Sequence, residues 1–442
     1  MLKLNKPFAF ITSNISLSSV QEMGWVILGQ IMNIIFSFII LKLLSKLGTA
    51  HYGIYALVVS IAILVGMVFH TPLSQGLIRF YYHYMEKKLV WKFVGIVYRI
   101  LLVLTIVLLI ISAVSLLIPQ FIETKQPGMF FMAACLYILA SKLNEFLNSV
   151  LNLIRKRKQN SILLGSEKAI TIILFYYLIL SNSLNLVYVL LTLVVVAMFS
   201  STVKLFIFIK SLPDEDEKSF KATMEMKQEI TGKLMKYMMP FFIWGFIGWL
   251  QFNGDKWIIN GFLSTSDVGI YSVMLGLITG LIITPFTVMN DFWSPIIYKQ
   301  YADMEDTNRI KKGIQYIRIN STVIFIIALF STLFTYLWGK DLIILISNSD
   351  YAAYWYLLPI ICLGTGLYYT GQSLTIQGMA LNVPKKYLPP KVAVGIVSVG
   401  LNILMIKIFG LDGIAYTILI IGFLYLIYIM NINWIILSAV SK

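Results

Sequence analysis

Long apolar tracts separated by short polar loops follow one another along almost the whole chain. We count twelve such tracts, each about 20 residues or longer, which is the length that crosses a bilayer as a helix. A helix suits this environment because its backbone hydrogen bonds close within the segment. The tracts lie at about residues 23–46, 52–78, 93–118, 128–154, 161–181, 185–209, 236–262, 268–298, 316–338, 352–380, 388–409 and 413–438. The sequence therefore predicts an all-α polytopic membrane protein with twelve transmembrane helices.

Basic residues are distributed unevenly among the loops. The 442 residues include 35 Lys and Arg against 20 Asp and Glu, a formal charge of +15. Loops on one side of the membrane carry most of the Lys and Arg residues, whereas the opposite loops carry only Lys46, Lys125, Lys340 and Lys407. The rich loops hold Arg79 to Lys92, Arg155 to Lys158, Lys210 to Lys236, Lys299 to Lys312, and Lys385 to Lys391. By the positive-inside rule, these loops and both termini are cytoplasmic. The bias accounts for the net charge, so we expect no nucleic-acid partner.

An internal repeat predicts how the helices are grouped. Gly53-Ile54-Tyr55 matches Gly269-Ile270-Tyr271 at an offset of 216 residues (269 − 53), and the same offset places Tyr82 on Tyr298. Each half then holds six helices in the same orientation, as in transporters built from parallel repeats. We expect an N-terminal lobe at residues 1–210, a cytoplasmic linker at 211–235 and a C-terminal lobe at 236–442. The two pseudo-symmetric lobes should surround a central cavity.

Polar residues inside the apolar tracts are candidates for lining this cavity, because a charge in lipid costs on the order of 2.5–3.5 kcal/mol on insertion scales. Each candidate has a structural alternative. Lys42 could snorkel outwards, Arg79 could anchor the topology, Lys142 and Glu145 could form an ion pair within one helix, and Asp255 and Lys256 could be a neutralised pair. Asn33, Gln251 and Asp291 complete the set of intramembrane candidates. The sequence contains no Walker motif, metal-ligand cluster or nucleophile arrangement, so we expect a transporter without a cofactor.

Three motifs resemble the polysaccharide transporter family of the MOP (multidrug/oligosaccharidyl-lipid/polysaccharide) exporter superfamily. They are DKWIINGFL at residues 255–263, VGIY at 268–271 and WSPIIYK at 293–299, with Lys256 where the family commonly has Arg. The first-half copy at Leu47-Gly48 to Ala56 also fits, and the resemblance covers essentially the whole chain. It implies a MATE-like fold. It also implies a flippase that moves undecaprenyl-pyrophosphate-linked oligosaccharide across the bacterial cytoplasmic membrane, for O-antigen, capsule or exopolysaccharide biosynthesis.

This cargo gives the candidate residues expected roles. A pyrophosphate and sugars cannot cross about 30 Å of hydrocarbon unaided, so we expect alternating access through a hydrated cavity. Expected substrate contacts are Lys42, Arg79, Lys142, Lys256, Asn33 and Gln251, and expected cavity or coupling acids are Glu145, Asp255 and Asp291. Proton and sodium coupling both stay open. Expected partners are the lipid-linked substrate, membrane lipids and a polysaccharide polymerase or chain-length machinery.

Two other functions make different predictions for this sequence. A MATE-like ion-coupled exporter of small organic cations predicts a cavity dominated by acids, whereas here acids and lysines are mixed. A membrane enzyme such as a repeat-unit polymerase or ligase usually carries a large external loop, and the external loops here are short. The flippase is therefore the favoured function, and the exporter is the main alternative.

Overall fold

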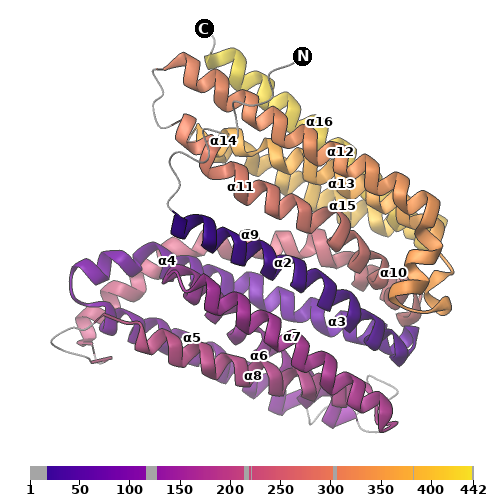
Figure 1. Cartoon of the computed structure of the whole chain (residues 1–442), viewed down its shortest axis with the longest axis horizontal. Coiled ribbons are helices and arrows are strands. Elements are labelled where there is room, and N and C mark those ends of the chain that lie inside the picture. The colour runs from indigo at the N-terminus through magenta and orange to yellow at the C-terminus, as the bar shows by residue number, and fades with distance from the viewer. Residues whose placement is uncertain are drawn as a thin grey trace. The chain divides into compact units, whose positions relative to one another are not determined.

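The computed structural model describes residues 17–115, 127–213, 219–220, 222–301, 306–381 and 383–440. These residues form helices joined by short turns (Figure 1). Nine of the described helices are long and apolar enough to cross a membrane. The expected all-α polytopic membrane fold is therefore confirmed. Residues 1–16, Lys125 and the acidic residues 214–217 of the expected linker lie outside the described ranges.

Packing divides the chain into two compact units, which we describe separately. Unit 1 comprises Met1–Leu43 and Val65–Phe242, and unit 2 comprises Leu44–Leu64 and Ile243–Lys442. The three internal boundaries, after Leu43, Leu64 and Phe242, fall within helical segments rather than in loops. The lobe boundaries expected from the sequence, at residues 210 and 236, remain a prediction.

Unit 1 is a bundle in which α6 packs on α5, α7 and α8, and α4 packs on α5 and α6 (Figure 1). Its helices are α2 (Leu17–Leu44), α4 (Thr71–Glu86), α5 (Val90–Ser115), α6 (Pro127–Leu153), α7 (Arg157–Leu180), α8 (Leu186–Lys210) and the first part of α9 (Met224–Phe262). Residues 224–235 of the expected linker are thus the first turns of α9.

The core of unit 1 follows from helical periodicity. On α4, Leu73, Leu77 and Tyr81 recur every fourth residue and are at most 3% exposed. This stripe belongs to the same apolar cluster as Leu234 and Met238 of α9. Residues four apart lie on one face of a helix, so the stripe buries a continuous side of α4. Burial of a large apolar side chain stabilises a fold by about 1.5–3 kcal/mol only where that side chain would otherwise contact water. Where it would otherwise contact lipid, close packing rather than the hydrophobic effect holds the helices together.

Unit 2 is centred on α13, which packs on α12 and α16, while α16 also packs on α15 (Figure 1). Its helices are α3 (Thr49–Val65), the second part of α9, α10 (Thr265–Ile278), α11 (Thr284–Gln300), α12 (Thr307–Ile346), α13 (Leu358–Leu374), α14 (Ile376–Ala380), α15 (Leu388–Phe409) and α16 (Leu411–Val440). Short 3₁₀ turns at Ser45–Leu47, Ser349–Ala352, Trp355–Leu357 and Pro384–Tyr387 join some of them.

The repeated Gly-Ile-Tyr motifs meet inside unit 2. A Cβ at Gly53 would overlap the carbonyl oxygen of Thr265, and a Cβ at Gly269 would overlap that of Thr49. The hydroxyl of Ser266 donates to Thr49 Oγ1 at 2.6 Å beside this contact. Small residues let membrane helices approach backbone to backbone, so the two glycines make the crossing of α3 and α10 possible. The sequence repeat therefore corresponds to a reciprocal helix contact.

A second repeated feature is a widened turn in the helical segment that contains each Gly-Ile-Tyr motif. A π-helical turn at Gly66–His70 is followed by Thr71-Pro72, and another at Thr279–Ile283 is followed by Thr284-Pro285. Proline has no N–H and its ring crowds the carbonyl four residues earlier, so the turn before it opens. The two Thr-Pro pairs lie 213 residues apart (284 − 71), close to the offset of 216 residues between the Gly-Ile-Tyr motifs, and are a further sign of the repeat.

Candidate functional site: a polar cavity in unit 2

A cavity of about 420 Å³ lies within unit 2, between α3, α9, α10, α13, α15 and α16. Six aromatic side chains contribute to its wall: Tyr52, Tyr55, Phe252, Tyr271, Tyr368 and Tyr369. Its polar lining includes the charged pair Asp255 and Lys256 together with Gln251, Asn253 and Asn402. We call this space the unit 2 cavity. Its volume falls within the range of about 300–1,000 Å³ that is usual for small-molecule sites.

Asp255 and Lys256 engage different partners. The hydroxyl of Tyr271 donates to Asp255 Oδ2, and the backbone N–H of Lys256 donates to Asp255 Oδ1 at 2.8 Å. The Lys256 ammonium instead donates to Asn253 Oδ1 at 2.8 Å. Asp255 is 7% exposed and Tyr271 is 1% exposed. The Asp255-Lys256 pair, which we call the charged step of α9, is thus held against the Gly-Ile-Tyr segment of α10. This contact explains why these two motifs occur together.

Several polar atoms of the lining are buried without a hydrogen bond. Within the described part of the chain, Gln251 Oε1, Ser272 Oγ and Asn402 Oδ1 have no hydrogen-bonding partner. All three residues line the unit 2 cavity. A buried polar atom that stays unpaired costs about 1–3 kcal/mol, so such atoms call for an explanation. Their grouping around one cavity is what a site for a hydroxyl-bearing ligand requires.

Lys391 contacts aromatic rings that line the unit 2 cavity. The sequence pattern grouped it with the cytoplasmic loops, but it lies in the first turn of α15. Its ammonium is 5.7 Å from the ring centre of Phe252, 5.8 Å from that of Trp244 and 6.0 Å from that of Tyr368, and it donates to Tyr368 Oη at 3.3 Å. Cation–π contacts of this kind are worth about 0.5–2 kcal/mol each. Lys391 therefore fixes two rings of the cavity wall and is more than a loop anchor.

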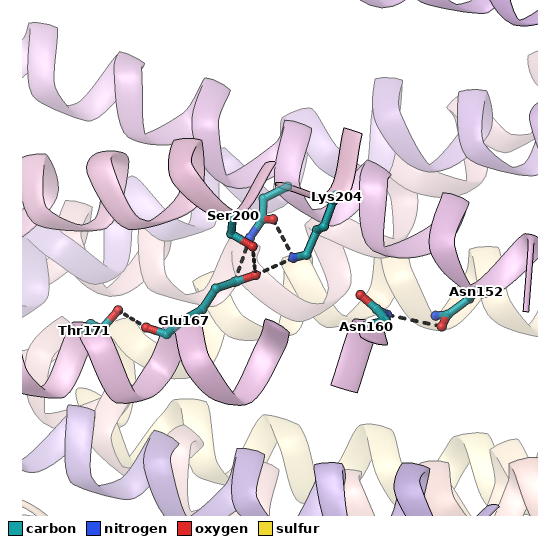
Figure 2. Close-up of polar contacts among 7 residues, drawn as sticks. Asn152, Asn160, Glu167, Thr171, Ser200 and Lys204 are labelled. Carbon is teal, nitrogen blue, oxygen red and sulfur yellow. Dashed lines mark hydrogen bonds and ion pairs between the residues drawn. The ribbon is translucent and has the colours of Figure 1, made fainter. Parts of the chain in front are cut away.

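Unit 1 contains a separate buried network that joins α6, α7 and α8 (Figure 2). Glu167 Oε1 accepts hydrogen bonds from the Lys204 ammonium and the Ser200 hydroxyl. Asn144 closes the network, since its Nδ2 donates to Glu167 Oε2 at 2.8 Å and its Oδ1 accepts from Lys204 at 2.7 Å. Lys204 is 0% exposed. The network satisfies both charges internally, so it is suited to holding three helices together.

Sequence reasoning had not singled out Glu167 or Lys204. Both residues could have been predicted to interact, because each lies within an apolar tract and the two carry opposite charges. A neighbouring residue, Lys168, was missed in the same way. Its ammonium donates to the Ser37 hydroxyl and, at 3.2 Å, to the backbone carbonyl of Asn33. The predicted substrate contact Asn33 thus lies beside a lysine of α7.

The remaining predicted site residues are dispersed. Lys142 and Glu145 form an ion pair within α6, and Lys142 is 8% exposed while the Glu145 side chain is 57% exposed. Lys42 is half-buried near the end of α2, and Arg79 and Asp291 are exposed on α4 and α11. The structure therefore brings Gln251, Asp255 and Lys256 together in one cavity and places the other candidates elsewhere in their own units.

Comparison with solved structures identifies the fold. An inward-facing multidrug resistance MATE family transporter of the MOP superfamily superimposes with a TM-score of 0.68 at 14% identity, covering 93% of this chain and 96% of the other. The lipid II flippase MurJ in an inward closed conformation gives 0.69 at 15% identity, covering 93% and 87%. A MOP superfamily transporter from Pyrococcus furiosus gives 0.59 at 14% identity, covering 95% and 94%. At these identities the likeness establishes the architecture alone.

Sequence comparison identifies the family. A search of curated protein sequences gives no match. The family model described as "polysaccharide biosynthesis protein" matches residues 19–290, which is more than half of the chain and includes both Gly-Ile-Tyr motifs and the charged step of α9. This chain, a multi-pass membrane protein with the fold of the MOP superfamily, therefore belongs to the polysaccharide biosynthesis protein family.

Proposed function

We propose that this chain is a flippase that moves undecaprenyl-pyrophosphate-linked oligosaccharide repeat units across the bacterial cytoplasmic membrane. The translocated units would serve surface polysaccharide biosynthesis, as O-antigen, capsule or exopolysaccharide. Membership of the polysaccharide biosynthesis family and the MOP architecture support this assignment. Both termini would be cytoplasmic, and the translocated units would pass to a polymerase or chain-length machinery.

The lining of the unit 2 cavity carries the proposal. A sugar presents apolar C–H faces and a rim of hydroxyl groups that both donate and accept hydrogen bonds. The aromatic rings of Tyr55, Phe252 and Tyr369 offer flat apolar surfaces to the C–H faces of a sugar. The buried acceptors Gln251 Oε1 and Asn402 Oδ1 suit its hydroxyl groups. A cavity with aromatic walls and unpaired amide oxygens is thus matched to an uncharged part of an oligosaccharide.

The charged side chains of the cavity would select among sugars. The Lys256 ammonium is held in position by Asn253 and has donors to spare for a phosphate or a sugar carboxylate. Asp255 already accepts from Tyr271 and from a backbone N–H, so its main role would be to keep the local charge near neutral. In unit 1, Asn33, Lys42, Arg79 and Lys142 remain proposed contacts for the head group. Glu145 of unit 1 and Asp291 of unit 2 remain proposed cavity or coupling acids.

Alternating access needs helices that bend at defined points. The two π-helical turns before Pro72 and Pro285 occupy equivalent places in the two copies of the repeat. A π turn has a looser backbone hydrogen-bond pattern than the flanking α-helix, which makes it a natural hinge. We propose that bending at these turns opens and closes access to the cavity while the polyprenyl chain stays in lipid.

A matched pair of double variants tests the sugar site. Gln251→Met with Asn402→Leu removes both unpaired amides at nearly constant volume. In a deletion strain complemented with this variant at normal protein level, we expect surface polysaccharide to fall and lipid-linked oligosaccharide to accumulate on the inner leaflet. The control, Gln315→Met with Asn431→Leu, makes the same exchanges at exposed positions of α12 and α16. Unchanged surface polysaccharide in the cavity variant would refute the assignment.

The exporter alternative rests on Asp255, an acid within an aromatic cavity, which would also suit an organic cation. Drug susceptibility of the deletion strain separates the two functions. Loss of resistance with intact surface polysaccharide would favour the exporter, whereas loss of polysaccharide with unchanged resistance favours the flippase.

A further inference from the structure

A second cavity, of about 620 Å³, lies within unit 1 where α4, α6 and α8 end and α7 begins. Its polar lining comprises Lys156, Gln159, Lys210 and Ser211. Its apolar lining includes Met85, Ile154 and Phe206. The positive-inside rule places these helix ends at the cytoplasmic surface. The cavity is thus amphiphilic and lies at the depth of the inner-leaflet head groups.

The backbone around this cavity is held in place independently of any ligand. Asn160 Nδ2 donates to Asn152 Oδ1 at 3.2 Å across the turn between α6 and α7 (Figure 2). The Tyr82 hydroxyl donates to the backbone carbonyl of Leu153 at 3.0 Å, which ties α4 to the same turn. The turn itself contains Arg155 at a φ of 58°, a conformation that favours glycine. A turn fixed in this way presents its lysine in a defined position.

The polar side of the cavity is suited to an anion. Lys156 and Lys210 are both exposed, and among the described residues that line the cavity there is no Asp or Glu. Lys156 is also the residue that precedes the first turn of α7, and no side chain caps that turn. The uncapped N-terminus of α7, with the positive pole of its helix dipole, therefore lies at the turn that carries Lys156. Two ammonium groups and a helix N-terminus form a favourable environment for phosphate oxygens.

The apolar side is suited to a hydrocarbon chain. Phe206 is 67% exposed, and Phe199, seven residues earlier on the same face of α8, is 64% exposed. Large exposed aromatic side chains on a membrane-spanning helix are accommodated by lipid chains rather than by water. An apolar stripe that leads from the bilayer to a pair of lysines matches a molecule with a long chain and an anionic head.

We propose that this cavity binds the phosphate-bearing head group of an inner-leaflet lipid, with the lipid chain lying along Phe206 and Phe199 of α8. Lys156 and Lys210 hold the phosphate oxygens, and Met85 and Ile154 contact the first part of the chain. The site is in unit 1 and does not depend on the sugar cavity of unit 2. Two lipids carry this chemistry: the polyprenyl-pyrophosphate cargo and the anionic phospholipids of the membrane.

Binding of defined lipids to the purified full-length chain tests the site directly. Native mass spectrometry from detergent would measure the affinity for polyprenyl pyrophosphate, phosphatidylglycerol and zwitterionic phosphatidylcholine. For Lys156→Gln with Lys210→Gln we expect about 30-fold weaker binding of the anionic lipid, which corresponds to about 1 kcal/mol per lysine. The control variant, Lys311→Gln with Lys312→Gln, removes two exposed lysines from α12 in unit 2 and should bind like the wild type.

The lipid panel also identifies the occupant. A preference for polyprenyl pyrophosphate supports a cargo site, and equal binding of phosphatidylglycerol supports a resident-lipid site. The proposal is overturned if the Lys156 and Lys210 variant binds anionic lipid like the control, or if phosphatidylcholine binds as tightly as the anionic lipids. If inorganic pyrophosphate bound as tightly as the lipid, the proposed role of the lipid's hydrocarbon chain would be overturned. Because no transport is measured, failure here is distinct from failure of the flippase assignment.

Discussion

Replacement of Lys204 by Met would expose the energetic role of the buried network in unit 1. Methionine keeps an unbranched apolar stem of similar length but removes the ammonium. Glu167 would then keep its hydrogen bonds from Ser200 and from Asn144 Nδ2 while losing its only cationic partner within the network. The Asn144 Oδ1 acceptor would lose its donor as well.

The size of the effect follows from burial. Breaking one side of a buried ion pair costs about 3–5 kcal/mol, because the remaining charge stays out of water without compensation. The Glu167 side chain retains 15% exposure, so we expect a loss near the lower end, about 3 kcal/mol. Adding Glu167→Gln removes the unpaired charge, and the double variant should recover most of this loss.

The measurement is the free energy of unfolding of the purified chain in mixed detergent and sodium dodecyl sulfate micelles, followed by circular dichroism. Lys233→Met provides the control, since Lys233 pairs with Glu229 one turn away but is 51% exposed. That change should cost at most about 0.5 kcal/mol. A loss below about 1 kcal/mol for Lys204→Met, or a double variant less stable than the single one, would refute the reasoning.

Two further predictions concern unit 2. Gly269→Val places a side chain against the carbonyl of Thr49, so the monodisperse fraction in size-exclusion chromatography should fall. Gly400→Ala, at a position with open space around it, should leave this fraction unchanged. Equal elution profiles for the two variants would contradict the helix contact. Tyr271→Phe removes a donor from the buried Asp255 carboxylate and should cost about 1–3 kcal/mol of unfolding free energy, and an unchanged unfolding midpoint would show that this bond is unimportant.

Much of the fold could be predicted because it depends on local sequence. The tract expected at residues 388–409 has the same bounds as α15, while α12 extends beyond the expected 316–338 to Thr307–Ile346. At the N-terminal end a largely polar segment, residues 307–315, continues the helix outside the apolar stretch, and at the C-terminal end the helix runs through the charged Lys340 and Asp341 into a further apolar run. Hydropathy therefore gives the part of a helix that lies in hydrocarbon, and the remaining turns depend on capping, here by Asp306.

The candidate site was predicted only in part. Gln251, Asp255 and Lys256 were singled out as polar residues within an apolar tract, and they do line one cavity. Their partners were not foreseen, since the pairing of Asp255 with Tyr271 depends on how α10 returns beside α9. Asn402, from a helix about 150 residues later in the chain, joins the same lining only through tertiary packing.

From the sequence alone, the class of protein, the approximate positions of many helices and the repeated glycines at which two of them touch could be predicted. The count of twelve membrane-spanning helices stays a prediction, since the described residues contain nine helices long and apolar enough to cross a membrane. These features follow from hydrocarbon thickness and from the need of each segment to satisfy its own backbone. Only the tertiary structure decided which buried charges meet, as with Glu167 and Lys204, and which polar atoms are left unpaired around a cavity. Side-chain partners across helices depend on helix rotation and crossing, and a run of apolar residues leaves both open.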